Sequence, residues 1–417
     1  MQTRRSLIDI VSEDIDQSGR AKVILAEIAR AESVDFTVAL GATAVSDIEG
    51  ASAAGADAQA RRLTPKLDAE ALITGRTALG EPLPSSPAGV TSPVVITRAC
   101  LSLIEHTVSI VDCGTFVPPQ VEHRATGARP GKNISQADSM HISEARNLFD
   151  QGREFALSRQ GKENSLPVLA ECVPGGTTTA LGVLKALGVE ADQLLSSSIP
   201  GKKVGIQAQL VASGLRRLEQ TLGPGELMKL CQRDPLYAVS SLGDPMQAFA
   251  AGFVLGTLEE SDDKINHPKA VVLAGGSQML AVYALARALV NAMNTTQSAH
   301  GERLANLMEE RLIVLTTTWV AYDPFADTKA LAQMIDAPYV AACPDFHSSR
   351  HPGLRAYEKG NVKEGVGAGA ALVLASLLRR HEWKSRQKDL TCEGSDRTVI
   401  DTIDDYYDSM VSPLAKS

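Results

Sequence analysis

The sequence has few cysteines, and none of them pair at a metal-binding or redox spacing. The six are scattered along 417 residues without any Cys-x-x-Cys motif, at Cys100, Cys113, Cys172, Cys231, Cys343 and Cys392. A zinc site or a disulfide framework normally needs closely or regularly spaced cysteines. We therefore expect reduced, mostly structural thiols, as in a cytoplasmic protein, and we predict neither a metal nor a cofactor.

Clustered basic residues and membrane-spanning runs are also missing. The formal net charge is −8, and Lys and Arg do not gather with aromatic residues, which argues against nucleic acid as a partner. The uncharged run from Gly365 to Leu378 is too short to span a bilayer. Acidic residues interrupt the first sixteen positions, so no secretory signal is expected. These absences predict a soluble, cytoplasmic protein without a membrane partner.

What is present is the composition and patterning of a globular α/β protein. Hydrophobic residues make up 44% of the chain and charged residues 22%. Runs that favour strands alternate with helical patterns, and polar or glycine-rich turns follow the strands. This alternation predicts a mostly parallel, Rossmann-like sheet with helices on both faces. A smaller helical and irregular accessory domain is expected from the N-terminal and C-terminal parts.

The chain divides into three predicted units. Residues 1–35 form a helical accessory segment, 36–345 a parallel α/β nucleotide-binding core, and 346–417 a C-terminal segment with closing helices. Within the core, residues 64–93 are rich in Pro, Gly and Ser, and we expect an extended, irregular arm there. Such an arm can wrap another part of the fold or a partner subunit.

Local patterns add predictions for single elements. They indicate helices over 1–32 and 141–160 and β-rich runs at 93–97 and 107–112. A strand-type segment at 203–213 precedes a helix-like run.

The most informative stretch combines a strand, a turn and a helix. Val168 to Ala170 form a short buried strand that leads to Glu171, to Gly175 and Gly176, and then to a helix beginning at Thr177–Thr179. Glycines allow a close approach of the backbone, and a helix N-terminus favours an anion. An ordinary turn and helix cap use the same residue types. The acid favours a functional interpretation, because a carboxylate after a buried strand needs a partner or a task.

Other polar turns should gather at the same place. Gly275, Gly276 and Ser277 follow one predicted strand, and Thr316–Thr318 end another. In open α/β sheets ligands bind beyond the carboxyl ends of the strands. We therefore expect these turns and Glu171 to share one edge of the sheet.

Two features near the C-terminus have competing interpretations. His347 and His351 have a spacing that suits a metal in a helix, but Pro352 and the adjacent serines indicate a loop, so we expect no metal there. Glu364 precedes a helix of small residues. It is either an acid that stabilises the helix N-terminus or a general base.

Four segments, in order, resemble the nicotinate-nucleotide:dimethylbenzimidazole phosphoribosyltransferase family. The segment from Glu171 to Thr178 resembles the family's Glu-Met-Gly-Ile-Gly-Asn-Thr-Thr motif. The stretches 243–252, 271–277 and 364–371 resemble its Gly-Gly-Phe-Glu helix, its strand ending Leu-Asp-Gly-Phe and its Glu-Gly-x-Gly-Ala-Ala segment. Because the first third is less familiar, the chain is similar to the divergent archaeal and cyanobacterial branch.

The resemblance implies transfer of ribose 5-phosphate from nicotinate mononucleotide to a benzimidazole or a purine. The products would be nicotinate and an α-ribotide for cobamide lower-ligand assembly. Glu364 would be the general base, and Glu171 would support the ribose or the positive charge that develops on the sugar. The phosphate would lie at Gly175, Gly176, Thr177 and Thr178, with Gly275, Gly276 and Ser277 nearby.

The departures from the family pattern leave alternatives open. The family's phosphate-binding lysine has only Lys203, beside Lys202, as a counterpart, and the family's Asn and Asp are Gly176 and Ala274 here. A different acceptor, such as adenine or a phenol, is one alternative. A non-catalytic nucleotide-binding protein of corrinoid metabolism is another. We predict a homodimer, because the family forms dimers. The small-residue helices at 243–256 and 365–376 can pack tightly, and the arm at 64–93 can reach a partner subunit.

Overall fold

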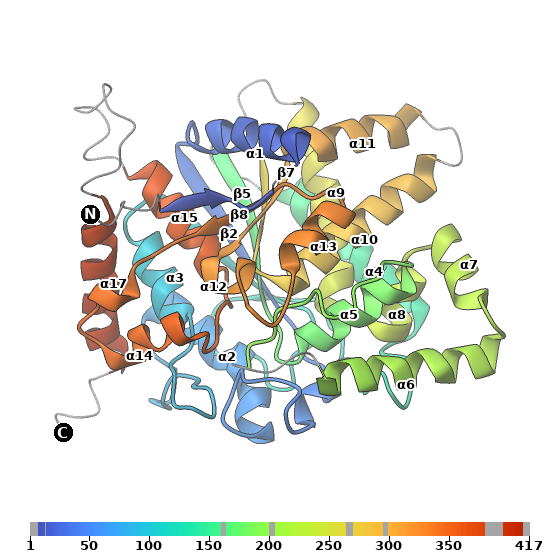
Figure 1. Ribbon diagram of the computed structural model, residues 1–417, viewed down its shortest axis with the longest axis horizontal. Coiled ribbons are helices and arrows are strands. Elements are labelled where there is room, and N and C mark those ends of the chain that lie inside the picture. The colour runs from blue at the N-terminus through green and yellow to red at the C-terminus, as the bar shows by residue number, and fades with distance from the viewer. Residues whose placement is uncertain are drawn as a thin grey trace.

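A single eight-stranded sheet organises the computed structural model, with helices on both of its faces (Figure 1). The structure describes residues 7–12, 14–159, 164–199, 205–263, 270–294, 299–379 and 395–411. The strands are β1 Ile8–Ile10, β2 Ser33–Leu40, β3 His106–Asp112, β4 Arg124–Ala125, β5 Ser165–Cys172, β6 Val271–Ala274, β7 Leu312–Thr317 and β8 Tyr339–Ala342. The predicted α/β class with a mostly parallel sheet is confirmed.

The helices carry the labels of Figure 1. They are α1 Ile15–Ile28, α2 Ala58–Thr74, α3 Val94–Leu101, α4 Ile142–Ser158, α5 Gly176–Ala186, α6 Gly205–Leu222, α7 Glu226–Arg233, α8 Leu236–Leu242, α9 Pro245–Asp263, α10 Ser277–Asn294, α11 Ala299–Arg311, α12 Thr318–Ala321, α13 Thr328–Met334, α14 Pro352–Arg355, α15 Ala368–Leu378 and α17 Ser395–Val411. Three short 3-10 turns, at Ala44–Asp47, Phe346–Ser348 and Tyr357–Lys359, complete the described elements.

The order of the strands places a switch point beside β5. The sheet runs β1-β8-β7-β6-β5-β2-β3-β4, and its neighbours are parallel except for β1 with β8. From β2 the chain builds outward through β3 to β4, then returns to β5 on the other side of β2. Crevices at such a reversal, beyond the carboxyl ends of the strands, are where open α/β sheets bind ligands.

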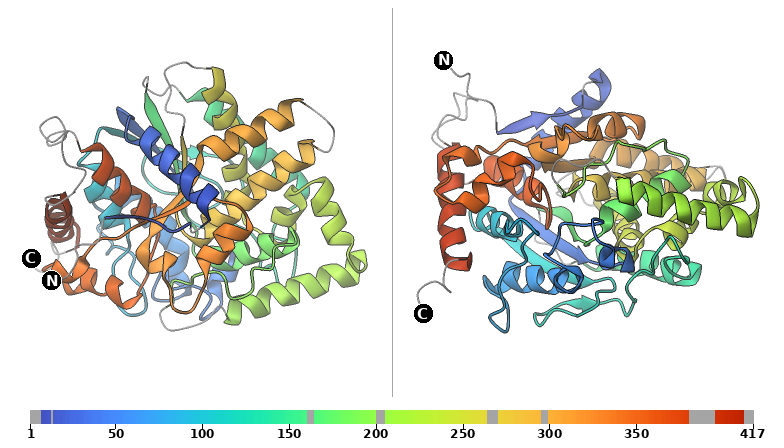
Figure 2. Two further views of the ribbon diagram at one scale, coloured as in Figure 1. Left: turned by 45° about the horizontal axis from the view of Figure 1, so that its top comes forward. Right: turned by 60° about the horizontal axis from the view of Figure 1, so that its bottom comes forward.

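Two hydrophobic cores cover the two faces, as side-chain alternation along the strands requires. On β5, Val168 and Ala170 belong to one core and Leu169 to the other. The first core lies under α3, α15 and α17, and the second under α4, α5, α9 and α10, on the opposite side of the sheet in Figures 1 and 2.

Small residues bring α4 and α9 very close together. A Cβ atom added at Gly252 would lie 1.9 Å from the carbonyl oxygen of Phe149, and one added at Gly152 would lie 2.0 Å from that of Phe249. The small residues of α15 are likewise buried, from Ala368 to Ala375. Tight packing of these helices therefore occurs within one chain, and the homodimer stays a prediction.

The arm predicted at 64–93 is wrong over its first part. Residues 64–74 belong to α2, and every side chain from Thr64 to Leu72 is buried. Pro65 lies inside this helix, so burial of the helix outweighs the proline's usual tendency to interrupt one. From Gly75 to Pro93 the chain is irregular, as predicted.

Three other local predictions are also wrong. The β-rich run at 93–97 is α3, whose apolar residues pack against α15 and α17. The strand-type segment at 203–213 is helix α6 from Gly205 onward. In the described part of the N-terminal segment, residues 15–28 form helix α1, while Ile8–Ile10 pair with β8 as an edge strand. In each case tertiary contacts outweigh local propensity.

Candidate active site

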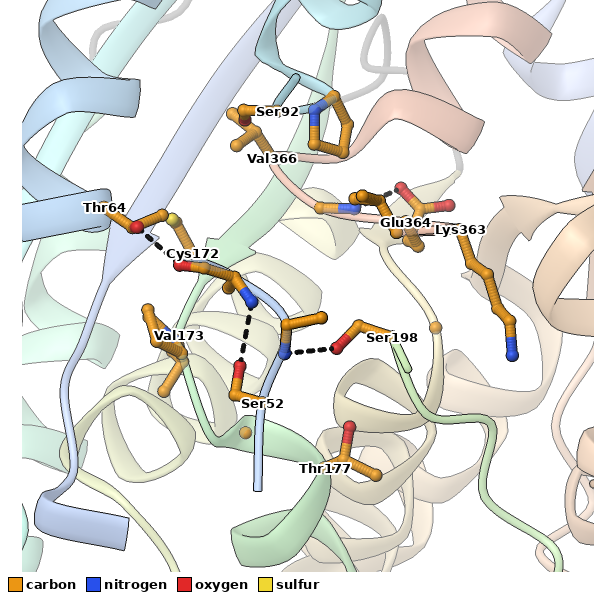
Figure 3. A pocket seen from close by; sticks show the side chains of 18 of the residues that line it. Ser52, Thr64, Ser92, Cys172, Val173, Thr177, Ser198, Lys363, Glu364 and Val366 are labelled. Carbon is orange, nitrogen blue, oxygen red and sulfur yellow. Dashed lines mark hydrogen bonds between the residues drawn. The ribbon is translucent and has the colours of Figure 1, made fainter. Parts of the chain in front are cut away.

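A cavity opens at the carboxyl end of β5, beside the switch point. Its walls come from segments distant in the chain, and Figure 3 shows ten labelled side chains around it. The lining residues fall in the ranges 52–54, 64–68, 84–93, 171–177, 196–198, 276–278 and 362–366, together with Val320. Of the polar turns predicted to share one edge of the sheet, residues 171–177 and 276–278 line this cavity. Thr316–Thr318 do not line it, although the Thr316 hydroxyl donates to Glu364, which does.

Glu171 is the penultimate residue of β5 and lines this cavity. Its side chain is half-buried, and Oε2 accepts a hydrogen bond from the amide of Val173 at 3.0 Å. Burial raises the pKa of Glu171 to about 8, and the nearby negative charges of Asp244 and Glu364 act in the same direction. This carboxyl group therefore holds its proton near neutral pH.

Glu364 lies in the loop before α15 and lines the same cavity. Its Oε1 accepts hydrogen bonds from the amides of Gly365 and Gly369, both at 3.2 Å, and its Oε2 accepts one from the Thr316 hydroxyl at 3.3 Å. Burial raises its pKa to about 7, while these hydrogen bonds oppose the shift. A carboxyl group with this pKa can take up or release a proton near neutrality.

The loop from Val362 to Gly367 brings the two glutamates together. The amide of Val366 donates to the carbonyl of Glu171 at 3.1 Å, and the Thr97 hydroxyl donates to the carbonyl of Val366 at 3.0 Å. Val362, Lys363 and Val366 have φ values of 64°, 69° and 51°. Left-handed backbone is costly for β-branched residues and persists where surrounding contacts enforce it, commonly at functional sites.

The glycine turn of the sequence motif forms the N-terminus of α5. Gly175 has φ 88° and caps the helix, and a Cβ added at Gly176 would lie 3.1 Å from the side chain of Gln278. Thr177 lines the cavity and is partly exposed to it. Thr178 does not line it: its side chain is fully buried, and its hydroxyl has no hydrogen-bond partner among the described residues.

A buried network supports this turn from behind. Asp244 is fully buried and accepts hydrogen bonds from the Thr179 hydroxyl at 2.5 Å and from Gln278 Nε2 at 2.7 Å. Gln278 Oε1 in turn accepts from Gln247 Nε2 at 3.2 Å. These side chains hold α5 and α10 at a fixed distance, which keeps the two turns of the cavity wall in place.

The cation of the site is a residue to which the sequence analysis gave no role. Lys363 is 3% exposed, forms an ion pair with Asp323 and lies 3.5 Å from the Ser196 hydroxyl. Ser196 also donates to Asp323 at 2.7 Å. Among the described residues that line the cavity, Lys363 is the one positively charged side chain. Its position directly before Glu364 was the available signal.

The remaining predicted site residues are distributed as follows. Gly276 and Ser277 line the cavity, and the Ser277 hydroxyl bonds the backbone of Ser196. Gly275 is not a lining residue but lies next to Glu171, since a Cβ there would be 3.7 Å from Oε1. Lys203 lies outside the described residues.

The two histidines lie apart from the cavity. The His347 side chain is 77% exposed, whereas His351 stacks on Tyr407, with its Nε2 3.1 Å from the Asp404 carbonyl. Within the described ranges no three His, Cys, Asp or Glu side chains are grouped so that they could hold a metal ion. None of the described helices is both long and apolar enough to cross a membrane.

Comparisons with known proteins agree with the motifs. Residues 97–300 match a family model described as Phosphoribosyltransferase. A UPF0284 protein of Gloeobacter violaceus is 39% identical over 82% of this chain and 83% of its own length. One from Rippkaea orientalis is 37% identical over 84% of this chain and 89% of its own.

Solved structures share the fold. The crystal structure of CobT from Thermus thermophilus matches with a TM-score of 0.54 and 18% identity, over 88% of this chain and 90% of that one. A structure of nicotinate-nucleotide-dimethylbenzimidazole phosphoribosyltransferase from the same organism matches with a TM-score of 0.52 and 16% identity, over 88% and 89%.

Proposed function

Since the chain belongs to the UPF0284 family and matches the phosphoribosyltransferase model over residues 97–300, we propose that it transfers ribose 5-phosphate between nitrogen bases. The donor is nicotinate mononucleotide, and the acceptor is a benzimidazole or a purine. The products are nicotinate and an α-ribotide 5′-phosphate, which would serve cobamide lower-ligand assembly.

One observation carries this proposal, namely the meeting of Glu171 and Glu364 in one cavity. Glu171 comes from β5 and Glu364 from the loop before α15. A backbone hydrogen bond from Val366 to Glu171 connects these two segments. The pKa values of the two glutamates are raised to about 8 and about 7. Removing a proton from a weakly acidic ring nitrogen needs a base whose pKa lies near neutral pH, and these carboxyl groups meet that requirement.

The reaction itself is a displacement at the anomeric carbon. The C1′–N bond to the pyridinium ring breaks, and its electron pair returns to the nitrogen, so nicotinate leaves without needing a proton. The unprotonated ring nitrogen of the acceptor forms the new bond from the opposite face with its lone pair, and the N–H proton of the acceptor's ring passes to the Glu364 carboxylate. Glu171 lies beside it, and with its proton held this carboxyl group supports the ribose by hydrogen bonding.

We place the phosphate of nicotinate mononucleotide at the end of the cavity formed by Thr177, Ser277 and Lys363. Thr177 at the start of α5 offers a hydroxyl group there, Ser277 places the start of α10 beside it, and Lys363 offers a positive charge. Helix N-termini and a buried cation both favour an anion. We therefore propose Lys363, in place of Lys203, as the phosphate-binding lysine.

Incubation with nicotinate mononucleotide and a panel of acceptors tests the proposal. The panel contains 5,6-dimethylbenzimidazole, adenine and a phenol, with mass detection of the α-ribotide. Glu364→Gln should abolish product, while Glu219→Gln, on the exposed side of α6, should leave the rate unchanged. Absence of product with every acceptor, together with measurable nucleotide binding, would overturn the proposal in favour of a binding protein.

A further inference from the structure

Asp68 is a buried carboxyl group that the mechanism above does not use. It lies on α2, lines the cavity and is only 2% exposed. Its Oδ2 accepts a weak hydrogen bond from the Cys172 thiol at 3.5 Å, and its Oδ1 has no hydrogen-bond partner among the described residues. A buried carboxyl oxygen without a partner is costly and calls for an explanation.

The next acid along the same helix shows what full pairing looks like. Glu70 is fully buried, and its carboxylate pairs with Lys66 at 3.3 Å and accepts the amides of Ala78 and Gln120, both at 2.9 Å. Those bonds attach the irregular segment after α2, through Ala78, and the loop after β3, through Gln120, to the helix. Asp68 has no such ion pair or backbone amide partners among the described residues: burial raises its pKa to about 7, and only side-chain hydrogen bonds with Ser92 and Cys172 oppose the shift.

Asp68 also lies close to the reacting groups. Its thiol partner Cys172 directly follows Glu171, and the charge of Asp68 contributes to the raised pKa of Glu171. In Figure 3, Cys172 lies on one side of the cavity and the Lys363 ammonium on the other. With the phosphate near Lys363, the Asp68 side is left for a base.

We propose that Asp68 selects the acceptor base by accepting a hydrogen bond from an amino group on the ring of that base; this inference rests on the proposed function. The acceptor class is then an aminopurine such as adenine. An amino group next to a ring nitrogen matches a carboxyl group, which can accept from one and donate to the other. The outer edge of 5,6-dimethylbenzimidazole carries only C–H and methyl groups, so it would leave Oδ1 unpaired.

The test compares acceptors that differ in the amino group alone. We expect kcat/KM for adenine to exceed that for unsubstituted purine by about tenfold to a hundredfold, because purine leaves a buried polar atom without a partner. Asp68→Ala should bring the two values together while purine stays a substrate. Asp68→Asn, which keeps the shape and one acceptor oxygen, should restore part of the preference. Asp150→Asn, exposed on α4, is the matched control and should change nothing.

A binding measurement keeps the two proposals separate. Equilibrium dialysis of adenine and purine against the full-length wild type and Asp68→Ala, with nicotinate mononucleotide present, needs no turnover. Equal use or equal binding of adenine and purine by the wild type would overturn this inference, as would an adenine preference that survives in Asp68→Ala. Failure to form product with any acceptor would overturn the proposed function alone, and the binding ratio would still decide the role of Asp68.

Discussion

The two sides of the cavity are built in different ways. On the β5 side, Glu171 and Glu364 are held mainly by backbone amides of Val173, Gly365 and Gly369. On the α2 side, one oxygen of Asp68 accepts from the Cys172 thiol, and the other stays open among the described residues. Backbone contacts fix a carboxyl group whatever the neighbouring side chains are. The β5 side therefore suits the proposed proton transfer, which is the same for every acceptor base. The α2 side suits discrimination between acceptor bases.

The largest expected effect separates the two glutamates on the β5 side. Glu364→Gln should lower kcat by about a hundredfold to ten-thousandfold, because general base catalysis is lost. Glu171→Gln should lower it by only about tenfold, since the amide keeps the size and neutral charge of the protonated carboxyl and the proton acceptor Glu364 stays in place. Steady-state rates at saturating substrates measure both. Equal losses in the two variants would contradict the division of roles.

Removing the cation should act on donor binding. Lys363→Met is expected to raise KM for nicotinate mononucleotide by about tenfold to a hundredfold with a smaller change in kcat, because a charge-assisted contact to phosphate is worth about 1.5–3 kcal/mol. Asp323→Asn should be combined with it, so that no unpaired buried carboxylate remains. Lys359→Met, at an exposed position in the same region, is the control. An unchanged KM in the double variant would remove Lys363 from the phosphate site.

The pH profile probes the protonation of Glu364 directly. A base must be ionised to accept a proton, so kcat/KM should fall about tenfold for each pH unit below about 7, the raised pKa of this group. Above that value the profile should level. A rate that is flat from pH 5 to pH 7 would contradict proton transfer to Glu364.

Stability should also depend on pH. The pKa values of Asp68, Glu171 and Glu364 in the folded protein are raised to about 7, 8 and 7. The folded state therefore binds more protons than the unfolded state between about pH 4.5 and pH 8, and the free energy of unfolding should decrease as pH rises through this window. Each carboxyl contributes at most about 1.4 kcal/mol per pH unit. Urea titrations across this range should show a shallower decrease for Asp68→Asn.

The sequence predicts the β5 side of the cavity better than the α2 side. The strand, acid and glycine turn from Val168 to Gly176 form a local signature, and β5 and α5 follow it closely. The role of Glu364 rested on a resemblance, and the structure brings it to the same cavity. Asp68 and the Lys363–Asp323 pair left no comparable signal, because their meaning depends on partners far away in the chain.

The errors in the fold prediction have a related cause. Val94, Val95, Ile96 and Thr97 favour a strand by propensity, yet burial between α15 and α17 makes them helical. In α2, Pro65 and a mixture of polar and apolar residues suggested an irregular arm, but this helix is covered on several sides. Helices buried all round lack the amphipathic periodicity on which sequence analysis relies.

The long sequence separation of the site contacts also bears on how an active molecule arises. Cys172 and Asp68 are 104 positions apart, and Lys363 and Ser196 are 167 apart. Closing such loops costs conformational entropy that local helices do not incur, so contacts of this kind slow folding. During synthesis the ribosome must release the chain well past residue 364 before both glutamates can meet. A nascent or truncated chain that already holds the glycine turn thus lacks Glu364, one of the two glutamates of the proposed active site.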